Sequence, residues 1–597
     1  MSNFRLKTPK SILKLLKKST YKYTPLQDDD IRLITLLPGE FDDDICISLT
    51  HKPLLPSDTG PDSKRLSKSD IQKTVWGDWK VYETPEGRYF FKSYRQGLIQ
   101  YKHPDPNFDP ELYAPLDHSA PTSNLQYEAL SYVWGSQSHP KVVYVETPSS
   151  IHKDTHPLKV IRATLFVGNN LACALRHLRH QDRHRVLWIH AICINQADDN
   201  ERSLQVQRMG QIYSLASRVI VWLGLEAEST ALAVSTLQNL AKKIEIANDN
   251  WYFCSPDSPE ATERDWYNLF YALSFKKEVW QALTVLLDRP WFTRVWTMQE
   301  IRKANPSSLF QWGHWQMSYY HFRRAVALLL LKRGVPNELA KPARDASEMV
   351  RGDGTVPWLH LLSYTGVRGC SDPRDKIYGI LSLAPPKIAG RIRPQYSSPV
   401  AEAYEDALLA SIEIWHRLDL LSNIDKQGIG FEGPTWVPDW SSPFKGVADK
   451  AINQASGVSR ASYRVRSRNT LEVLGVHFTT ICTVSEPIPY DKAEAVRHFQ
   501  NIEPNSLLHD TYSTGESLLQ AYLRLLLLDR TSDHFPKCSQ YLKLRDWEDV
   551  FLRRVLKLAP LQNYHEFPLN CLMGSSFLTS SADYFGFGPS VSQPGKH

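Results

Sequence analysis

A carboxylate and a large aromatic side chain stand four residues apart in RPWFTRVWTMQEI, residues 289–301. On a helix, Trp296 and Glu300 lie on one face, so the acid shares its surroundings with an indole ring. Two explanations fit this pattern. Either Glu300 is a buried or half-buried acid that pairs with Arg294 or Arg302 to orient the helix, which is a common structural use, or the protein needs the carboxylate for chemistry.

The elements that must position this helix are predicted to include strands of a parallel sheet. The apolar runs VLWIHAICI (186–194) and RVIVWLG (218–224) are typical of buried parallel strands. The segment between them has a loose apolar face at helical spacing, and Asp198 with Glu201 predicts a capping box at its start. A strand, a helix and a strand within about forty residues indicate a βαβ unit and therefore a parallel sheet.

Further strands are predicted at 125–135 and 308–313. Ligands of open parallel sheets bind outside the carboxyl ends of the strands. The polar and aromatic residues that follow the predicted strands are therefore candidate ligand contacts, together with the indole of the helix. These candidates are Tyr132, Trp134, Gly135, Asn195, Gln196 and Trp296. The alternative for the tryptophans is that they are core aromatics.

His190 and Cys193 lie inside the run 186–194 and raise the question of a nucleophile pair. Residues three apart on a strand face opposite sides of the sheet, so we expect no such pair. His190 is then either a core histidine with satisfied hydrogen bonds or a proton carrier.

A second region, within residues 74–106, predicts a three-stranded antiparallel meander broken by the turns PEG and RQG. Trp79, the pair Phe90-Phe91, Tyr101 and Pro104 resemble the WW domain in order and spacing. The resemblance implies that Trp79 and Pro104 form a structural buckle.

The same resemblance implies that a proline-rich peptide lies across an aromatic groove made by Phe90, Tyr94 and Tyr101. The sequence departs from the WW pattern, because Tyr101 replaces the second tryptophan, Tyr94 the groove histidine, and Ile99 the groove threonine. The alternative is a degenerate WW fold that is kept as a surface insert.

Three blocks together resemble the heterokaryon incompatibility (HET) domain of filamentous fungi. They are YEALSYVWG (127–135), LWIHAICINQADDNERSLQVQRMGQIYSLASRVIVWLG (187–224) and RPWFTRVWTMQE (289–300). The resemblance covers about 125–315 and implies a role in fungal non-self recognition, in which incompatible fusion triggers programmed cell death. It also implies an α/β fold with a TIR-like, flavodoxin-like parallel sheet.

HET domains are similar to TIR domains, several of which cleave NAD⁺ with a glutamate in a W-x-x-x-E pattern that Trp296 and Glu300 match. The resemblance therefore implies that Glu300 is catalytic and that NAD⁺ is a substrate, with no metal and no resident cofactor. Glu300 would bind the ribose hydroxyls and stabilise an oxocarbenium-like transition state. The family usually has Asp where this chain has His190. The alternative function is a non-catalytic signalling module that acts by self-association or partner binding.

Composition limits the classes of function. The chain has 597 residues, 42% of them hydrophobic and 22% charged, with a net charge of +6, which is typical of a soluble globular protein. The small net charge gives little support for nucleic-acid binding, and the longest apolar run, 325–331, is too short to cross a bilayer. The eight scattered cysteines predict neither zinc sites nor disulfides, which favours a cytoplasmic location.

The predicted organisation has five parts. They are a basic tail (1–30), lead-in strands (31–51), the WW-like module (74–106), the HET domain (125–315) and a mixed α+β C-terminal region (316–597), which we expect to be truncated at its end. The tail is predicted to be a solvated extension, and a targeting segment is the alternative.

Overall fold

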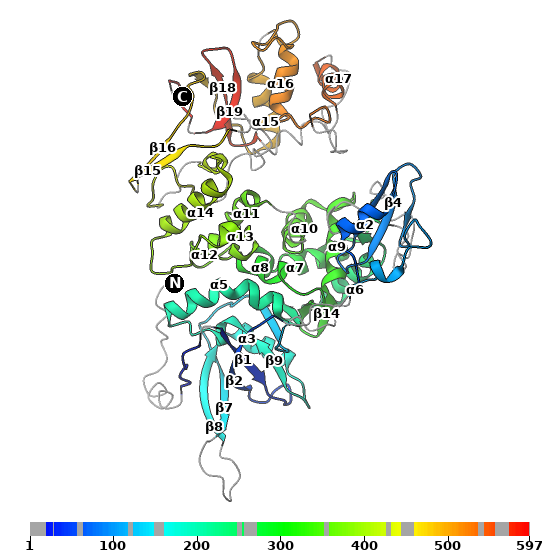
Figure 1. The fold of residues 1–597 in the computed structure, drawn as a ribbon, viewed down its shortest axis with the longest axis vertical. Helices are drawn as coiled ribbons and strands as arrows, with labels where there is room; N and C mark the ends of the chain where they lie inside the picture. Colours follow the sequence, from blue (N-terminus) through cyan, green and yellow to red (C-terminus); the bar gives the residue numbers. More distant parts are fainter. Residues whose placement is uncertain are drawn as a thin grey trace, which may run out of the picture. The chain divides into compact units, whose positions relative to one another are not determined.

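The computed structural model describes residues 20–595, and its chain divides into two compact units (Figure 1). Within that span the gaps in the description are residues 28, 57–63, 117–122, 149–159, 248–253, 256–271, 352–356, 425–430, 443–458, 468, 505, 535–542, 556–571 and 591. The first unit is Met1–Val356 with Arg368–Ala384 and Pro394–Ser397, and the second is the remainder. Most of the predicted basic tail, residues 1–19, lies outside the described residues.

A nine-stranded sheet lies at the centre of the first unit, in the order β14-β13-β10-β6-β9-β1-β2-β7-β8. Its four central strands pair in parallel and follow the predicted apolar runs, which are short and flanked by turns. When these four strands are numbered by their order in the chain, their order across the sheet is second, first, third, fourth. These strands are β6 (Glu128–Tyr132), β9 (Arg185–Trp188), β10 (Arg218–Trp222) and β13 (Leu309–Trp312).

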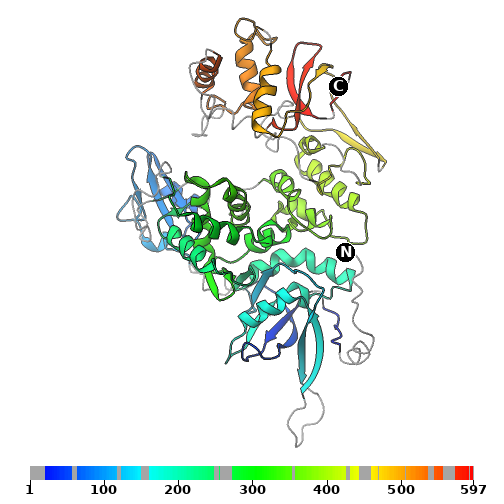
Figure 2. The same ribbon diagram turned by 180° about the vertical axis from the view of Figure 1, so that it is seen from behind.

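The outer strands make the sheet mixed, whereas a parallel sheet was predicted. The lead-in strands β1 (Asp30–Leu36) and β2 (Cys46–Pro53) form an antiparallel pair, and β1 is antiparallel to β9. β7 (Lys141–Pro148) and β8 (Val160–Val167) form a long antiparallel ribbon at one edge, seen from both sides in Figures 1 and 2. β14 (Trp315–Ser318) closes the other edge.

Helix α5 (Asp199–Leu215) links β9 to β10 and packs on the sheet through buried side chains. The Tyr213 ring contacts Trp188 of β9 edge to face, and its hydroxyl donates to the Leu130 carbonyl of β6 (3.2 Å). Helix α8 (Trp296–Arg302) contacts α5, β6 and β10. It follows the 3-10 turn η3 (Pro290–Thr293), because Pro290 cannot continue the preceding helix.

The strand predicted at 186–194 is wrong beyond Trp188, because the chain turns into a short helix, α4 (His190–Cys193). The Ile189 carbonyl accepts from the backbone N–H of Cys193 (2.7 Å), and the Gln196 amide donates to the His190 carbonyl (2.8 Å). An apolar run that is buried in either conformation cannot by itself distinguish a strand from a helix.

The capping box is half confirmed. The Asp198 carboxylate accepts from the backbone N–H groups of Asn200 (3.0 Å) and Glu201 (3.1 Å) and so caps α5. The Glu201 side chain does not return to the cap, because it binds the Asn195 N–H (2.7 Å) and Arg32.

The first unit contains further helices and continues beyond residue 315. A small antiparallel pair, β11 (Glu245–Ile246) with β12 (Cys254–Ser255), accompanies them. The helices are α3 (Asn169–Leu178), α6 (Thr230–Ala241), α7 (Lys277–Leu287), α9 (Tyr319–Leu331), α10 (Asn337–Met349), α12 (Asp375–Tyr378) and the 3-10 turn η4 (Leu381–Leu383).

The predicted meander is confirmed as a three-stranded antiparallel sheet of β3 (Trp79–Glu83), β4 (Tyr89–Ser93) and β5 (Ile99–Gln100). Helix α2 (Lys68–Thr74) precedes it, and the 3-10 turn η1 (Pro110–Tyr113) follows it. One face of the sheet has its own small core, in which Ile71, Val81, Tyr89 and Phe91 are buried and Trp79 packs against them.

The second unit mixes helices with two small antiparallel sheets, as predicted for an α+β region. Its helical elements are α11 (Trp358–Thr365), α13 (Pro386–Ala389), α14 (Val400–Trp415), η5 (Asp419–Asn423), α15 (Lys492–Asn501), α16 (Leu518–Leu526) and α17 (Leu544–Val555). Its strands are β15 (Tyr463–Ser467), β16 (Thr470–Val473), β17 (Ile481–Val484), β18 (Ser575–Ser580) and β19 (Phe585–Pro589).

Candidate functional site

Glu300 is a buried carboxylate bound by hydroxyl groups. It is 2% exposed, and it accepts a hydrogen bond from the hydroxyl of Ser131 on β6, with the Tyr213 hydroxyl of α5 beside it. The Trp291 indole donates to the same Ser131 oxygen (2.8 Å), which orients that hydroxyl toward the acid. Burial raises the pKa of Glu300 to about 7, although the hydrogen bond from Ser131 and the neighbouring Tyr213 hydroxyl lower it.

Neither arginine that the structural explanation assigned to Glu300 forms an ion pair with it. Arg302 lies beside Glu348 (3.6 Å) and donates to the Glu348 carbonyl (Nε, 3.1 Å). Arg294 affects Glu300 only at longer range, where its charge lowers the pKa of the carboxyl. Within the described part of the chain, Glu300 is therefore a buried acid without a counter-ion.

The segments that follow β6 and β9 meet through Trp134 and His190. The Trp134 indole N–H donates to Nε2 of His190, and the two rings stack with centroids 5.4 Å apart. The Tyr132 ring lies 5.4 Å from the same imidazole. Burial, and secondarily the charge of Arg294, lowers the pKa of His190 to about 3, so the imidazole is neutral at physiological pH.

Cys193 does not join this group. Its thiol accepts from the backbone N–H of Ile189 (3.4 Å), and burial raises its pKa to about 12. The expectation that His190 and Cys193 form no nucleophile pair agrees with these contacts, although the strand argument for it was wrong. A thiol with so high a pKa is unreactive at neutral pH.

Trp296 faces a second buried carboxylate, Asp375, which the sequence did not single out. The Trp296 indole hydrogen-bonds to Asp375, and the Tyr396 hydroxyl donates to its Oδ1 (2.7 Å). Asp375 is 5% exposed, and burial raises its pKa to about 6. Its signal in the sequence was the block CSDPRDKIYGILSLA at 370–384, which the structure brings against α8. Trp296 is thus held by a partner within the chain.

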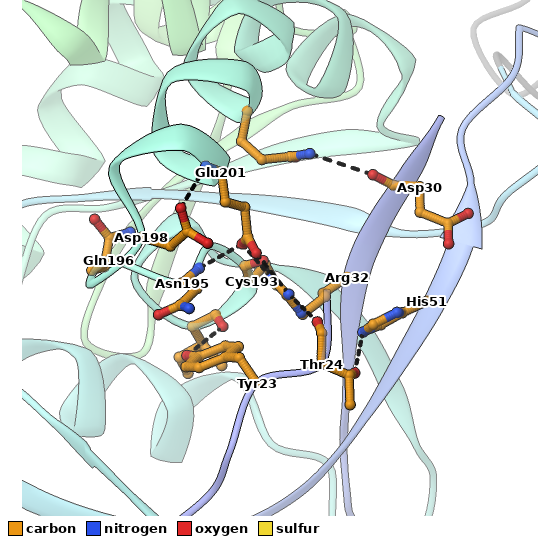
Figure 3. A network of polar contacts seen from close by, with 12 residues as sticks. Tyr23, Thr24, Asp30, Arg32, His51, Cys193, Asn195, Gln196, Asp198 and Glu201 are labelled. Atoms are coloured by element: carbon orange, nitrogen blue, oxygen red, sulfur yellow. Dashed lines mark hydrogen bonds and ion pairs between the residues drawn. The ribbon is translucent and has the colours of Figure 1, made fainter. Parts of the chain in front are cut away.

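Asn195 and Gln196 brace the loop after α4, and both side chains are half-buried. A fully buried arginine of the lead-in strand anchors that loop (Figure 3). Arg32 binds Glu201 with both terminal nitrogens (Nη2 to Oε2, 2.9 Å) and donates to the Cys193 carbonyl (3.0 Å). The role of Arg32 could not be predicted, since nothing in the sequence pairs β1 with α5.

The structure gathers most of the candidate ligand residues at one edge of the sheet. Tyr132, Trp134 and His190 are connected by the ring contacts above, and the charge of Glu300 acts on Tyr132. Gly135 follows at an exposed position with φ of +66°, which favours glycine. Trp296 lies on the same helix as Glu300 but turns its indole to Asp375. The site thus offers a carboxylate that titrates near neutral pH and, after β9, a neutral imidazole.

The predicted peptide-binding residues of the meander lie elsewhere and differ in accessibility. Phe90 is fully buried, and the Tyr101 hydroxyl donates to Glu245 of β11. Tyr94 is 53% exposed, and its hydroxyl contacts that of Tyr82 (2.7 Å). The chain itself therefore covers the end of the meander that carries Phe90 and Tyr101. Peptide binding stays a prediction.

Buried charged side chains also lie at this covered end of the meander. Glu245 is fully buried and pairs with Arg88 of the meander (2.9 Å) and with Arg324 of α9 (3.3 Å). Arg324 also pairs with Glu86 (2.6 Å) in the turn between β3 and β4. These ion pairs join the meander to the rest of the first unit.

The described residues contain no group of three or more His, Cys, Asp or Glu side chains placed to hold a metal ion. In the same part of the chain, no helix has the length and apolar character needed to cross a membrane.

Comparison with known proteins agrees with the three sequence blocks. Residues 127–300 match the family model for the heterokaryon incompatibility protein (HET) domain. The chain is 27% identical over 398 residues to heterokaryon incompatibility protein 6, OR allele, of Neurospora crassa, a match that covers 57% of each protein. No solved structure matches the chain. Residues 127–300 of this chain are therefore a HET domain, and the chain is similar to a fungal heterokaryon incompatibility protein over part of its length.

Proposed function

We propose that this protein acts in heterokaryon incompatibility, the recognition of non-self between fungal cells, with programmed cell death as its outcome. The HET domain and the name of the Neurospora relative support this role. Because the match spans 57% of that relative, the role of the whole protein is inferred from part of its length. A cytoplasmic location, self-association and peptide binding by the WW-like meander belong to the same proposal.

We further propose that the HET domain cleaves the bond between nicotinamide and ribose in NAD⁺, with Glu300 as the catalytic residue. The observation that carries this proposal is a buried acid with a pKa of about 7 and no counter-ion among the described residues. Carboxyl groups with strongly perturbed pKa values cluster at functional sites. The order of the four parallel strands, with β6 between β9 and β10, begins like that of flavodoxin-like sheets and so supports the TIR-like comparison.

In this reaction the electron pair of the glycosidic bond passes to the nicotinamide nitrogen and neutralises its positive charge. The ribose C1′ takes on oxocarbenium character, and the ionised Glu300 stabilises that charge. Water then adds to C1′ and loses a proton, which gives ADP-ribose. Because the reaction needs the ionised acid, we expect the rate to fall as the pH drops below about 7, the pKa of Glu300.

The burial of Glu300 favours a second candidate function. A side chain that is 2% exposed also suits a purely structural acid, which holds α8 against β6 through Ser131. In that case the HET domain is a non-catalytic signalling module that acts through self-association or partner binding.

Nicotinamide release distinguishes the two candidates. The purified full-length chain, dilute and then concentrated with a crowding agent to favour assembly, is incubated with NAD⁺ and the products are separated by chromatography. We expect release by the wild type and by the exposed control Glu338→Gln, and a loss of at least a hundredfold in Glu300→Ala and Glu300→Gln. No release under any assembly condition would end the enzymatic proposal and leave the signalling role. Release that survives both Glu300 substitutions would assign catalysis to another residue.

A further inference from the structure

Arg294 places an unpartnered cation at the candidate site. Its backbone is held because residue 369 bridges the flanking positions, with Gly369 N–H donating to Thr293 (2.7 Å) and Val295 N–H donating to Gly369 (3.1 Å). The guanidinium has five N–H donors, and it is half-buried. No hydrogen bond or ion pair reaches this guanidinium from any residue in the described part of the chain. Because these two bonds fix the backbone at residue 294, the Arg294 guanidinium can reach only a limited region around it.

His190 supplies a second donor without an acceptor. An indole N–H only donates, so Nε2 of His190 must be the acceptor in the bond from Trp134. A neutral imidazole then carries its proton on Nδ1. Nδ1 is a buried atom, and it has no hydrogen-bond partner within the described residues. A buried donor left unpaired costs free energy that a bound acceptor would recover.

The two donors lie within electrostatic range of each other. The charge of Arg294 acts on His190, on Tyr132 and on Glu300, so the guanidinium lies within electrostatic range of all three. Trp134 and Gly135, which follow β6, are half-buried and exposed, so solvent reaches this edge of the sheet at these two residues. What the site lacks is a group that accepts hydrogen bonds from Arg294 and His190.

We propose that Arg294 and Nδ1–H of His190 form an anion-binding subsite that takes the diphosphate of a dinucleotide. The choice of a dinucleotide rests on the proposed cleavage of NAD⁺, whereas the preference for an anion rests on the two donors alone. Arginine binds phosphate oxygens through two parallel hydrogen bonds, and a neutral histidine adds one more. An acid at position 190 would accept hydrogen bonds and repel an anion.

Calorimetric titration of the full-length protein tests the subsite without turnover. The probes are ADP-ribose, inorganic diphosphate as its competitor, and adenosine as a ligand without phosphate. We expect Arg294→Gln to weaken ADP-ribose binding about tenfold or more, since a charge-assisted bidentate contact is lost, and His190→Asp to weaken it at least as much. Arg294→Lys keeps the charge but not the fork and should fall between. The control Arg162→Gln, at an exposed pair with Glu146, should bind as the wild type does.

The outcomes separate the subsite from the proposed catalysis. Loss of ADP-ribose and diphosphate binding in Arg294→Gln, with adenosine binding and the far-UV circular dichroism spectrum unchanged, supports the subsite even if NAD⁺ is never cleaved. Equal affinity of the wild type and Arg294→Gln for both anionic probes overturns it. If NAD⁺ is cleaved, we expect Arg294→Gln to raise KM more than it lowers kcat, and an unchanged KM overturns the subsite while the enzymatic function stands.

Discussion

Two buried glutamates of the first unit, Glu245 and Glu300, have opposite surroundings. Glu245 is fully buried and pairs with Arg88 and Arg324, so its charge is neutralised at the contact between the meander and α9. Glu300 is buried almost as deeply, yet its hydrogen-bond donor is the Ser131 hydroxyl and the cation that acts on it, Arg294, lies at longer range.

The difference in surroundings bears on the role of each acid. Where a buried carboxylate only joins two parts of the chain, counter-ions accompany it, because an unpaired buried charge is costly. The same is true of Glu201, which is paired with the buried Arg32. At Glu300 the chain supplies a hydroxyl donor in place of a counter-ion, an arrangement that fits the proposed catalytic role.

The largest effect on stability is expected when the charge of Glu245 is removed from its two arginine partners. Glu245→Ala leaves Arg88 and Arg324 without the charge they share, so we expect the free energy of unfolding to fall by about 3–5 kcal/mol. Urea denaturation of the full-length chain measures the change. Glu338→Ala, at an exposed position of α10, is the control and should change stability by less than about 0.5 kcal/mol. An equally small change in Glu245→Ala would show that the ion pairs are not needed.

The next effect concerns the unpaired acid and depends on pH. The pKa of Glu300 is about 7 in the folded chain against an ordinary value of 4.5, so the unfolded state loses its proton first. The stability that the protonated acid contributes is therefore fully present below about pH 4.5 and is lost as the pH rises through about 7, by about 3 kcal/mol in all.

Glu300→Gln keeps the shape and cannot ionise, so it should not show this loss. We expect the variant to be more stable than the wild type at pH 8 and to gain no advantage at pH 4.5. Denaturation series at the two pH values measure the difference, and His190 and Asp375, which also have shifted pKa values, are present in both proteins. Parallel pH profiles would mean that Glu300 ionises normally.

A smaller effect on stability is expected at Ser131, whose hydroxyl donates to Glu300. Ser131→Ala removes a hydrogen bond that lowers the pKa of Glu300, so that pKa should rise further, and stability at pH 8 should drop by about 1–2 kcal/mol. If NAD⁺ is cleaved, the acid limb of the pH–rate profile moves to higher pH. Ser203→Ala, whose hydroxyl bonds only within α5 (to Asp199, 2.8 Å), should leave that limb in place.

The smallest effect on stability is expected at the open end of the meander. Tyr94 is 53% exposed, so Tyr94→Ala should change the free energy of unfolding by less than about 0.5 kcal/mol. Fluorescence titration of the full-length chain with a panel of proline-rich peptides tests the predicted groove. Binding by the wild type that Tyr94→Ala abolishes supports it, whereas no binding of any peptide means that the meander is a structural insert, joined to the domain through Glu245.

Prediction from sequence succeeded where the signal is local. The strands β6, β10 and β13, the helix α8 and the meander follow from short apolar runs, helical spacing and turn residues, which act over a few positions. It failed at 189–194, because a segment that is buried on every side has no periodicity to distinguish α4 from a strand. The mixed character of the sheet depends on which strands become neighbours, and that is not encoded in any one segment.

The sequence by itself determined that Glu300 and Trp296 share a helix and that three blocks make a HET domain. Only the tertiary structure decided what surrounds them. Ser131 meets Glu300 across 169 residues of chain, and Asp375, from a block far downstream, receives the indole that we had considered a ligand platform. The absence of a counter-ion at Glu300 among the described residues is also a tertiary property. Spacing sets the neighbours within one helix, whereas the dielectric surroundings and partners of a buried charge depend on how separate segments pack.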